Sequence, residues 1–138
     1  MAKRKRSAAK RPTKGTSQAV LIDRRLLGTW KSDRKRTFEG HLWPATATPT
    51  IQRRYRAIFG KLVVRWTPKR TTSELDGLRE TNTYQVLASD IDSVAVLVDG
   101  SIYHIHFDGD EYYYLNLGRT MEYFRRVPKS ERPQRKQR

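Results

Sequence analysis

The sequence predicts a mainly β protein: about eight antiparallel strands closed into an up-and-down barrel, with a short helical insert between strands 1 and 2 and disordered basic tails. Two observations and one physical argument lead to this prediction. Short segments rich in β-branched and aromatic residues follow one another closely. Three of the breaks between them contain Asp-Gly, which favours tight hairpins because both residues tolerate a positive φ. Closing the sheet leaves no strand edge unpaired.

The chain divides into a basic tail over residues 1–18, a barrel domain over 19–127 and a second basic tail over 128–138. The first tail holds seven Lys and Arg and no acid, and the second holds five with one acid, so the ends carry +11 of the formal charge of +15. Such like-charged segments lack the apolar surface needed to form a core. The barrel domain itself is only mildly basic.

The strands are expected along almost the whole middle part of the chain. The first lies at 26–33, and the others lie at 62–67, 70–75, 81–88, 91–98, 102–107, 111–117 and 120–127. Pro68 ends the second strand because proline cannot donate to a ladder. The Asp-Gly pairs stand at 76–77, 99–100 and 108–109, so the strands from 62 onward form a meander.

The connection between the first two strands, residues 34–61, shows helical signals. Thr48 occupies an N-cap position, Pro49 the first helical position, and Gly60 follows the last turn. A shorter helix is expected from Arg34 to about residue 40, with Asp33 as its cap. We expect this insert to cover one end of the barrel.

Several classes of protein are disfavoured by the sequence. The chain has no cysteine, which excludes disulfides and thiol catalysis and suits a cytoplasmic location. No run approaches the ~18 apolar residues of a spanning helix, so no membrane partner is expected. We find no G-x-S-x-G, P-loop or G-x-G-x-x-G motif. The sequence therefore predicts no cofactor and gives no positive sign of an enzyme.

Gly28-Thr29-Trp30 on the first strand resembles the G-x-W signature of the calycins, the group of lipocalins and fatty-acid-binding proteins. The last strand, residues 122–127, resembles the final strand of that group, where a basic residue packs over the tryptophan. The chain is also similar to a bacterial lipocalin-like family in its LGTW start and EYFRRV end. This resemblance implies a small ligand in or near the barrel mouth. Glu122-x-Phe124 stands where fatty-acid-binding proteins have their Arg-x-Tyr pair, so fatty-acid binding is not implied.

The motif also has a physical meaning of its own. Gly28 allows another segment to approach the backbone closely, and Trp30 offers a large apolar face. Because side chains alternate along a strand, Arg126, rather than Arg125, shares a face with Phe124 and is the expected partner of Trp30. A guanidinium stacks well on an indole. We therefore predict that Gly28, Trp30 and Arg126 close one end of the barrel.

The candidate ligand-binding residues are Trp30, Tyr55, Glu74, His104 and His106. The two histidines flank Ile105 and so project from one face of a strand, as in a metal half-site that His41, Glu74 or Glu111 would complete. The alternative is polar packing, which we favour because no closely spaced third ligand accompanies the pair. No metal is predicted.

Two further clusters have alternative interpretations. Acidic residues gather at Glu74, Asp76, Asp108, Asp110 and Glu111, where a paired-carboxylate hydrolase is the alternative to ordinary turn chemistry, which we favour. The aromatic hairpin consists of Tyr103 and Phe107 followed by residues 112–114. It is either a stacking platform for bases or cross-strand packing, and we favour packing.

The positive charge of the tails indicates a second, alternative function. The first tail would bind the phosphates of RNA or DNA without sequence preference, because its cations release counterions from the nucleic acid. The tail cations are Lys3, Arg4, Lys5, Arg6, Lys10, Arg11 and Lys14. The alternative is a solubilising tail. No helix-turn-helix, zinc-finger or RRM signature accompanies it, and the oligomeric state is not predicted.

Overall fold

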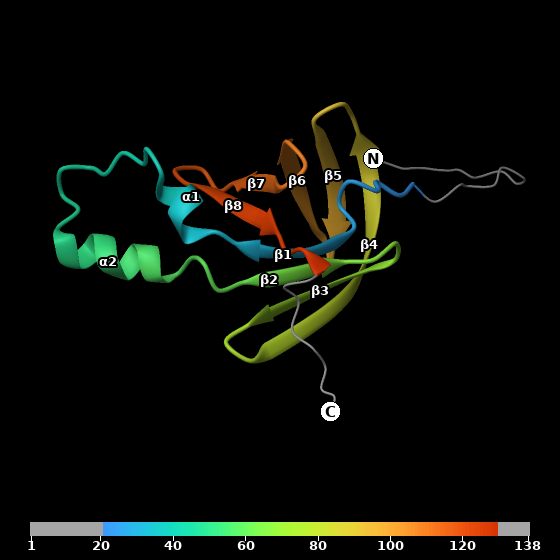
Figure 1. Cartoon of the computed structure of the whole chain (residues 1–138), viewed down its shortest axis with the longest axis horizontal. Coiled ribbons are helices and arrows are strands. Elements are labelled where there is room, and N and C mark those ends of the chain that lie inside the picture. Colours follow the sequence, from blue (N-terminus) through green and yellow to red (C-terminus); the bar gives the residue numbers. More distant parts are fainter. Residues whose placement is uncertain (1–20, 130–138) are drawn as a thin grey trace, which may run out of the picture.

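The computed structural model describes residues 21–129, which form one closed antiparallel barrel of eight strands in sequence order (Figure 1). β1 pairs with both β2 and β8, so the ring has no free edge. The strands are β1 (Gly28–Ser32), β2 (Val63–Trp66), β3 (Arg70–Leu75), β4 (Leu78–Ser89), β5 (Ser93–Val98), β6 (Ser101–Asp108), β7 (Tyr112–Asn116) and β8 (Met121–Arg126). The predicted fold class and strand order are thereby confirmed.

Two of the Asp-Gly hairpins have the predicted backbone geometry. Asp76 and Gly77 have φ of 52° and 83°, and Asp99 and Gly100 have φ of 49° and 80°. Two consecutive positive φ values are the condition of the type I′ turn, whose twist matches that of the flanking strands. The third site differs: Asp108 still pairs with Tyr112, and the chain turns over the residues between them, with only Gly109 at a positive φ.

The insert contains two helices, α1 (Arg34–Phe38) and α2 (Pro49–Ala57), and both predicted caps are present. The Asp33 carboxylate accepts a hydrogen bond from the Arg36 N–H, and the Thr48 hydroxyl accepts one from the Ile51 N–H. These side chains satisfy backbone donors that have no partner within the helix. α1 packs beside β8, whereas α2 lies beyond the end of the barrel (Figure 1).

The core fills the half of the barrel opposite the insert. Strand alternation sends one set of side chains inward from every strand. Its largest fully buried members are Trp30, Tyr113 and Phe124, and the Trp30 and Tyr113 ring centroids lie 4.6 Å apart. The buried apolar cluster consists of Leu26, Trp30, Val64, Trp66, Val86, Val94, Val96, Ile105, Tyr113 and Phe124. The opposite half of the barrel is less filled, and that is where the cavity lies.

Candidate functional site: an interior cavity above a sealed barrel end

The closed end of the barrel is built from the three residues that the sequence placed together. The Arg126 guanidinium carbon lies 4.3 Å from the centre of the Trp30 ring, and Trp30 pairs with Arg126 across β1 and β8. Arg126 donates hydrogen bonds to the carbonyls of Leu27 and Arg25, at 2.8 and 2.7 Å. Gly28 has a φ of 124°, and a Cβ there would lie 2.9 Å from Arg126 Nη1. The absence of a side chain at Gly28 gives the guanidinium its place.

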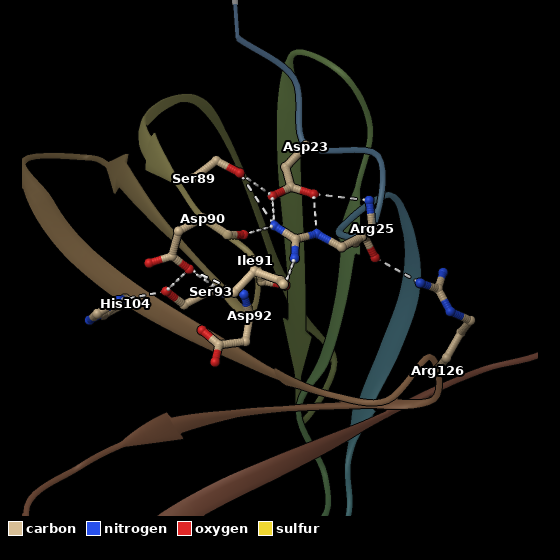
Figure 2. Close-up of polar contacts among 9 residues, drawn as sticks. All are labelled: Asp23, Arg25, Ser89, Asp90, Ile91, Asp92, Ser93, His104 and Arg126. Carbon is tan, nitrogen blue, oxygen red and sulfur yellow. Dashed lines mark hydrogen bonds and ion pairs between the residues drawn. The ribbon is translucent and has the colours of Figure 1, made fainter.

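A second polar network ties the segment before β1 to the loop between β4 and β5 (Figure 2). Arg25 donates to both carboxylate oxygens of Asp23 and to the carbonyls of Asp90 and Ile91. Burial raises the pKa of Asp23, but hydrogen bonds from Arg25 and Ser89 outweigh it and hold that pKa below its ordinary value. The network thus fastens residues 23–25 across this end of the barrel.

A cavity of about 250 Å³ occupies the inside of the barrel toward the end where β1 leads into the insert and β2 follows it. Apart from Leu62, which directly precedes β2, its lining comes from strands and their hairpin turns, and none comes from α1 or α2. The lining residues are Leu62, Val64, Trp66, Thr71, Ser73, Glu80, Asn82, Val98, Asp99, Ser101, Tyr103, Ile105, Tyr113, Leu115 and Phe124. The insert is therefore not a cover over this cavity, contrary to our expectation from the sequence.

One wall of the cavity is polar, and strand register explains why. Thr71 pairs with Asn82 and Ser73 pairs with Glu80 across β3 and β4, so four polar side chains form two adjacent cross-strand pairs. All four face the cavity. Among residues 21–129, none of these side chains has a hydrogen-bond or ion-pair partner. Thr71 is only 7% exposed, so solvent scarcely reaches it. We call these four residues the polar wall.

The opposite wall and the floor are apolar and aromatic. Ile105, Leu115 and Phe124 come from β6, β7 and β8. On the floor, the Trp66 indole N–H donates to the Tyr113 hydroxyl at 3.2 Å. Burial raises the pKa of that phenol far above its ordinary value, so Tyr113 is neutral at any physiological pH. The cavity thus presents a hydrogen-bonding surface along β3 and β4 and an apolar surface along β6, β7 and β8, and the hairpin of β5 and β6 adds the polar residues Asp99 and Ser101.

His104 and His106 do not lie in the cavity, which corrects our expectation that a polar pocket would contain them. Ile105 is 1% exposed and points inward, so strand alternation directs both histidines outward. The apolar series of Tyr103, Ile105 and Phe107 was the sequence signal for this orientation. The His104 ring nitrogen lies 3.2 Å from the Ser93 hydroxyl, which in turn donates to Asp90 (Figure 2). This is the polar packing that we favoured.

The structure brings no third metal ligand to the histidine pair. The two rings are 4.3 Å apart, and His106 stacks on Tyr114. His41 instead lies in the insert, 4.5 Å from the ring of Trp43. Across residues 21–129, no three His, Asp or Glu side chains are grouped so that they could hold a metal ion. The half-site is therefore not completed by any residue that the structure describes.

The other candidate ligand-binding residues also lie away from the cavity. Trp30 is on the sealed side, where it is fully buried beneath Arg126. Glu74 is exposed and lies 3.6 Å from Arg79, on the face of β3 opposite to Ser73. Tyr55 belongs to an aromatic cluster of the insert and hydrogen bonds to Thr120 at 2.6 Å. The members of that cluster are Phe38, His41, Trp43, Tyr55 and Phe59. It gives the insert a small core of its own.

The aromatic hairpin is divided between the two faces of the sheet. Tyr113 points into the barrel, whereas Tyr114 lies outside, with its ring centroid 5.1 Å from that of Tyr123 and 4.9 Å from that of His106. The Arg36 guanidinium lies 4.7 Å from the centre of the Tyr123 ring. These rings pack on one another across β6, β7 and β8. Cross-strand packing is the interpretation that we favoured, and stacking on bases remains the untested alternative.

The acids of the turns have local structural roles where the structure shows contacts. Asp76 lies at a positive φ in its turn and 3.8 Å from Lys61, and Asp108 forms an ion pair with Arg36.

The polar wall, in contrast, was not identified from the sequence. The residues of β3 and of the start of β4 are polar on both faces, so their alternation does not reveal which set points inward.

The cations of the first tail, from Lys3 to Lys14, lie outside the described residues, as does most of the second tail. No described helix has the length and apolar character required to cross a bilayer.

No family model, curated protein or solved structure matches this chain. Fold and site together define the molecule as a small closed antiparallel β-barrel, sealed at one end and hollow toward the other.

Proposed function

We propose that this protein is a lipocalin-like binding protein that holds one small amphiphilic molecule in the interior cavity of its barrel. The polar wall carries the proposal. A polar group that leaves water without gaining a partner costs free energy, so a barrel selected only for packing would have an apolar residue at the buried position of Thr71. Thr71 and its neighbours instead face an open volume bounded on the other side by apolar residues.

The size of the cavity limits the ligand. Pockets for drug-sized molecules measure about 300–1,000 Å³, and eight-stranded barrels leave room for side chains or one small ligand. A volume of about 250 Å³ therefore fits a compact molecule, not a long lipid. The calycin-like arrangement of Trp30 beneath Arg126 supports the lipocalin-like assignment. The lack of cysteine supports a reducing, cytoplasmic setting.

Native mass spectrometry of freshly purified protein, combined with NMR titration by 2-naphthylmethanol, tests this function. We expect a retained small molecule, or shifts of cavity residues on titration. Asn82→Trp places a large ring in the cavity and should abolish binding. Thr83→Trp, at the adjacent exposed position on the other face of β4, should leave it intact. Binding that persists unchanged in Asn82→Trp, or no binding by folded wild-type protein, would contradict the proposal.

A second proposed function is non-specific association with nucleic acid. It is supported by the +11 that the two ends carry, against +4 for residues 19–127. In this alternative the tails bind phosphates and the barrel serves as their scaffold. The tails and the cavity can be altered separately, so one does not exclude the other.

A further inference from the structure

The lining of the cavity has a charge opposite to that of the whole chain. The protein carries a formal charge of +15, yet the charged residues among the cavity-lining side chains of residues 21–129 are Glu80 and Asp99, with no Lys, Arg or His. Several cations adjoin lining residues in the sequence, and the two beside Leu62 and Glu80 have acidic partners. Lys61 lies 3.8 Å from Asp76, and Arg79 lies 3.6 Å from Glu74 on the outer face.

Every residue of the polar wall can accept a hydrogen bond from a ligand. A carboxylate can only accept hydrogen bonds, whereas hydroxyl and amide groups can both donate and accept. The polar wall thus offers acceptors at all four of its positions. Thr71 supplies an independent sign of a ligand, because the residue is more than nine-tenths buried, lines the cavity and has no hydrogen-bond partner among the described residues. A ligand in the cavity could supply that partner.

We infer that the cavity selects a small neutral or cationic molecule whose amine or hydroxyl group donates hydrogen bonds to the polar wall, and that it rejects carboxylates and phosphates. This inference rests on the proposed function and specifies its ligand class. An anion in the cavity would lose its hydration beside Glu80 and Asp99 without gaining a cation. An ammonium group would gain from both acids, while the apolar body lies against Leu115 and Phe124.

The position of each group within the cavity follows from the register. Ser73 and Glu80 form the pair nearer the hairpin of β3 and β4, and Thr71 and Asn82 form the deeper pair. Glu80 is exposed and Thr71 is buried, so the charged group lies toward the mouth and the uncharged hydrogen bonds lie below it.

A matched series of probes tests the inference in the full-length protein. Four naphthalenes share one apolar body and differ in one substituent: 2-naphthylmethylamine, 2-naphthylmethanol, 2-methylnaphthalene and 2-naphthoate. At pH 7 they are a cation, a neutral donor, a hydrocarbon and an anion. We expect dissociation constants to rise in that order, with at least about a tenfold difference between amine and carboxylate, equivalent to ~1.4 kcal/mol. Chemical shifts of cavity residues, followed by NMR, report the site of binding.

Two pairs of variants assign the discrimination to the polar wall. Glu80→Gln should weaken binding of the amine about 2- to 5-fold, as for a partly exposed ion pair, and leave the alcohol unchanged. Its control is Glu74→Gln, an exposed acid on the other face of β3. Thr71→Val should weaken the alcohol about 2- to 10-fold, as for one lost hydrogen bond. Its control is Thr72→Val, which changes the adjacent, outward-facing residue.

The outcomes separate the inference from the function on which it rests. If none of the four probes binds to folded protein, the proposed function fails and the inference fails with it. If all four bind equally well, or the carboxylate binds as tightly as the amine, only the inference is overturned. It is also overturned if Glu80→Gln and Glu74→Gln, or Thr71→Val and Thr72→Val, have the same effect on binding. Melting temperatures of the variants show that they remain folded.

Discussion

Replacing Arg126 by alanine tests the seal at the closed end of the barrel. The guanidinium donates to the carbonyls of Leu27, Arg25 and Asp110, and it stacks on Trp30. A charged hydrogen bond contributes roughly 1.5–3 kcal/mol and a partly desolvated cation–π contact about 0.5–2 kcal/mol. The bond to Asp110 is exposed and the contributions overlap, so we expect Arg126→Ala to lower the free energy of unfolding by about 4 kcal/mol.

This loss is large enough to measure by two independent methods. For a domain of this size about 4 kcal/mol corresponds to a decrease in Tm of roughly 15 °C. Urea denaturation should give a lower midpoint with an unchanged slope, because the surface exposed on unfolding is nearly the same. The Tm of Arg126→Lys should lie between those of the wild-type protein and Arg126→Ala. An ammonium on a flexible stem cannot stack on Trp30 and reach three carbonyls together.

Arg125 provides the matched control for this experiment. It is the adjacent residue of β8, exposed on the outer face, and Arg125→Ala should change stability by no more than about 0.5 kcal/mol. If Arg126→Ala costs less than about 1 kcal/mol, or if Arg125→Ala costs as much as Arg126→Ala, the guanidinium does not seal the barrel.

Three further predictions concern neighbouring features. Gly28→Ala should lower the free energy of unfolding, measured by urea denaturation, by about 1–3 kcal/mol because φ is 124° there. The loss should be smaller in the Arg126→Ala background, where Nη1 no longer lies 2.9 Å from the new Cβ. Equal losses in the two backgrounds would show that backbone strain alone is responsible. Burial raises the pKa of Glu122, although the Ser32 hydroxyl donates to it at 2.6 Å. The folded state therefore favours its protonated form, so this group's stabilising contribution is complete below about pH 4 and is lost as the pH rises through the raised pKa. Glu122→Gln should accordingly raise Tm at pH 7 but not at pH 4, and a Tm difference that is independent of pH would contradict this. Removing residues 1–18 should abolish the salt-dependent binding of RNA or DNA, for which five phosphate contacts give a log–log slope of about −4 to −5; a slope that survives the deletion would assign the binding to the barrel surface.

The sequence by itself determined the ring of strands and its seal. Asp-Gly turns and runs of β-branched residues are local signals, since turn geometry depends on the φ preferences of two residues. The pairing of Trp30 with Arg126 could also be predicted, because alternation along β1 and β8 leaves one guanidinium on the inner face. The helix caps at Asp33 and Thr48 are local in the same sense.

The tertiary structure alone decided where the site lies. Thr71 and Thr72 are chemically alike, and so are Glu74 and Glu80; the closed ring determines which of them face inward. The insert could not be placed from its sequence either, because its connections allow it to fold over the barrel or away from it. Its aromatic rings pack around Phe38 within the insert, so α2 extends beyond the barrel (Figure 1), and neither helix lines the cavity.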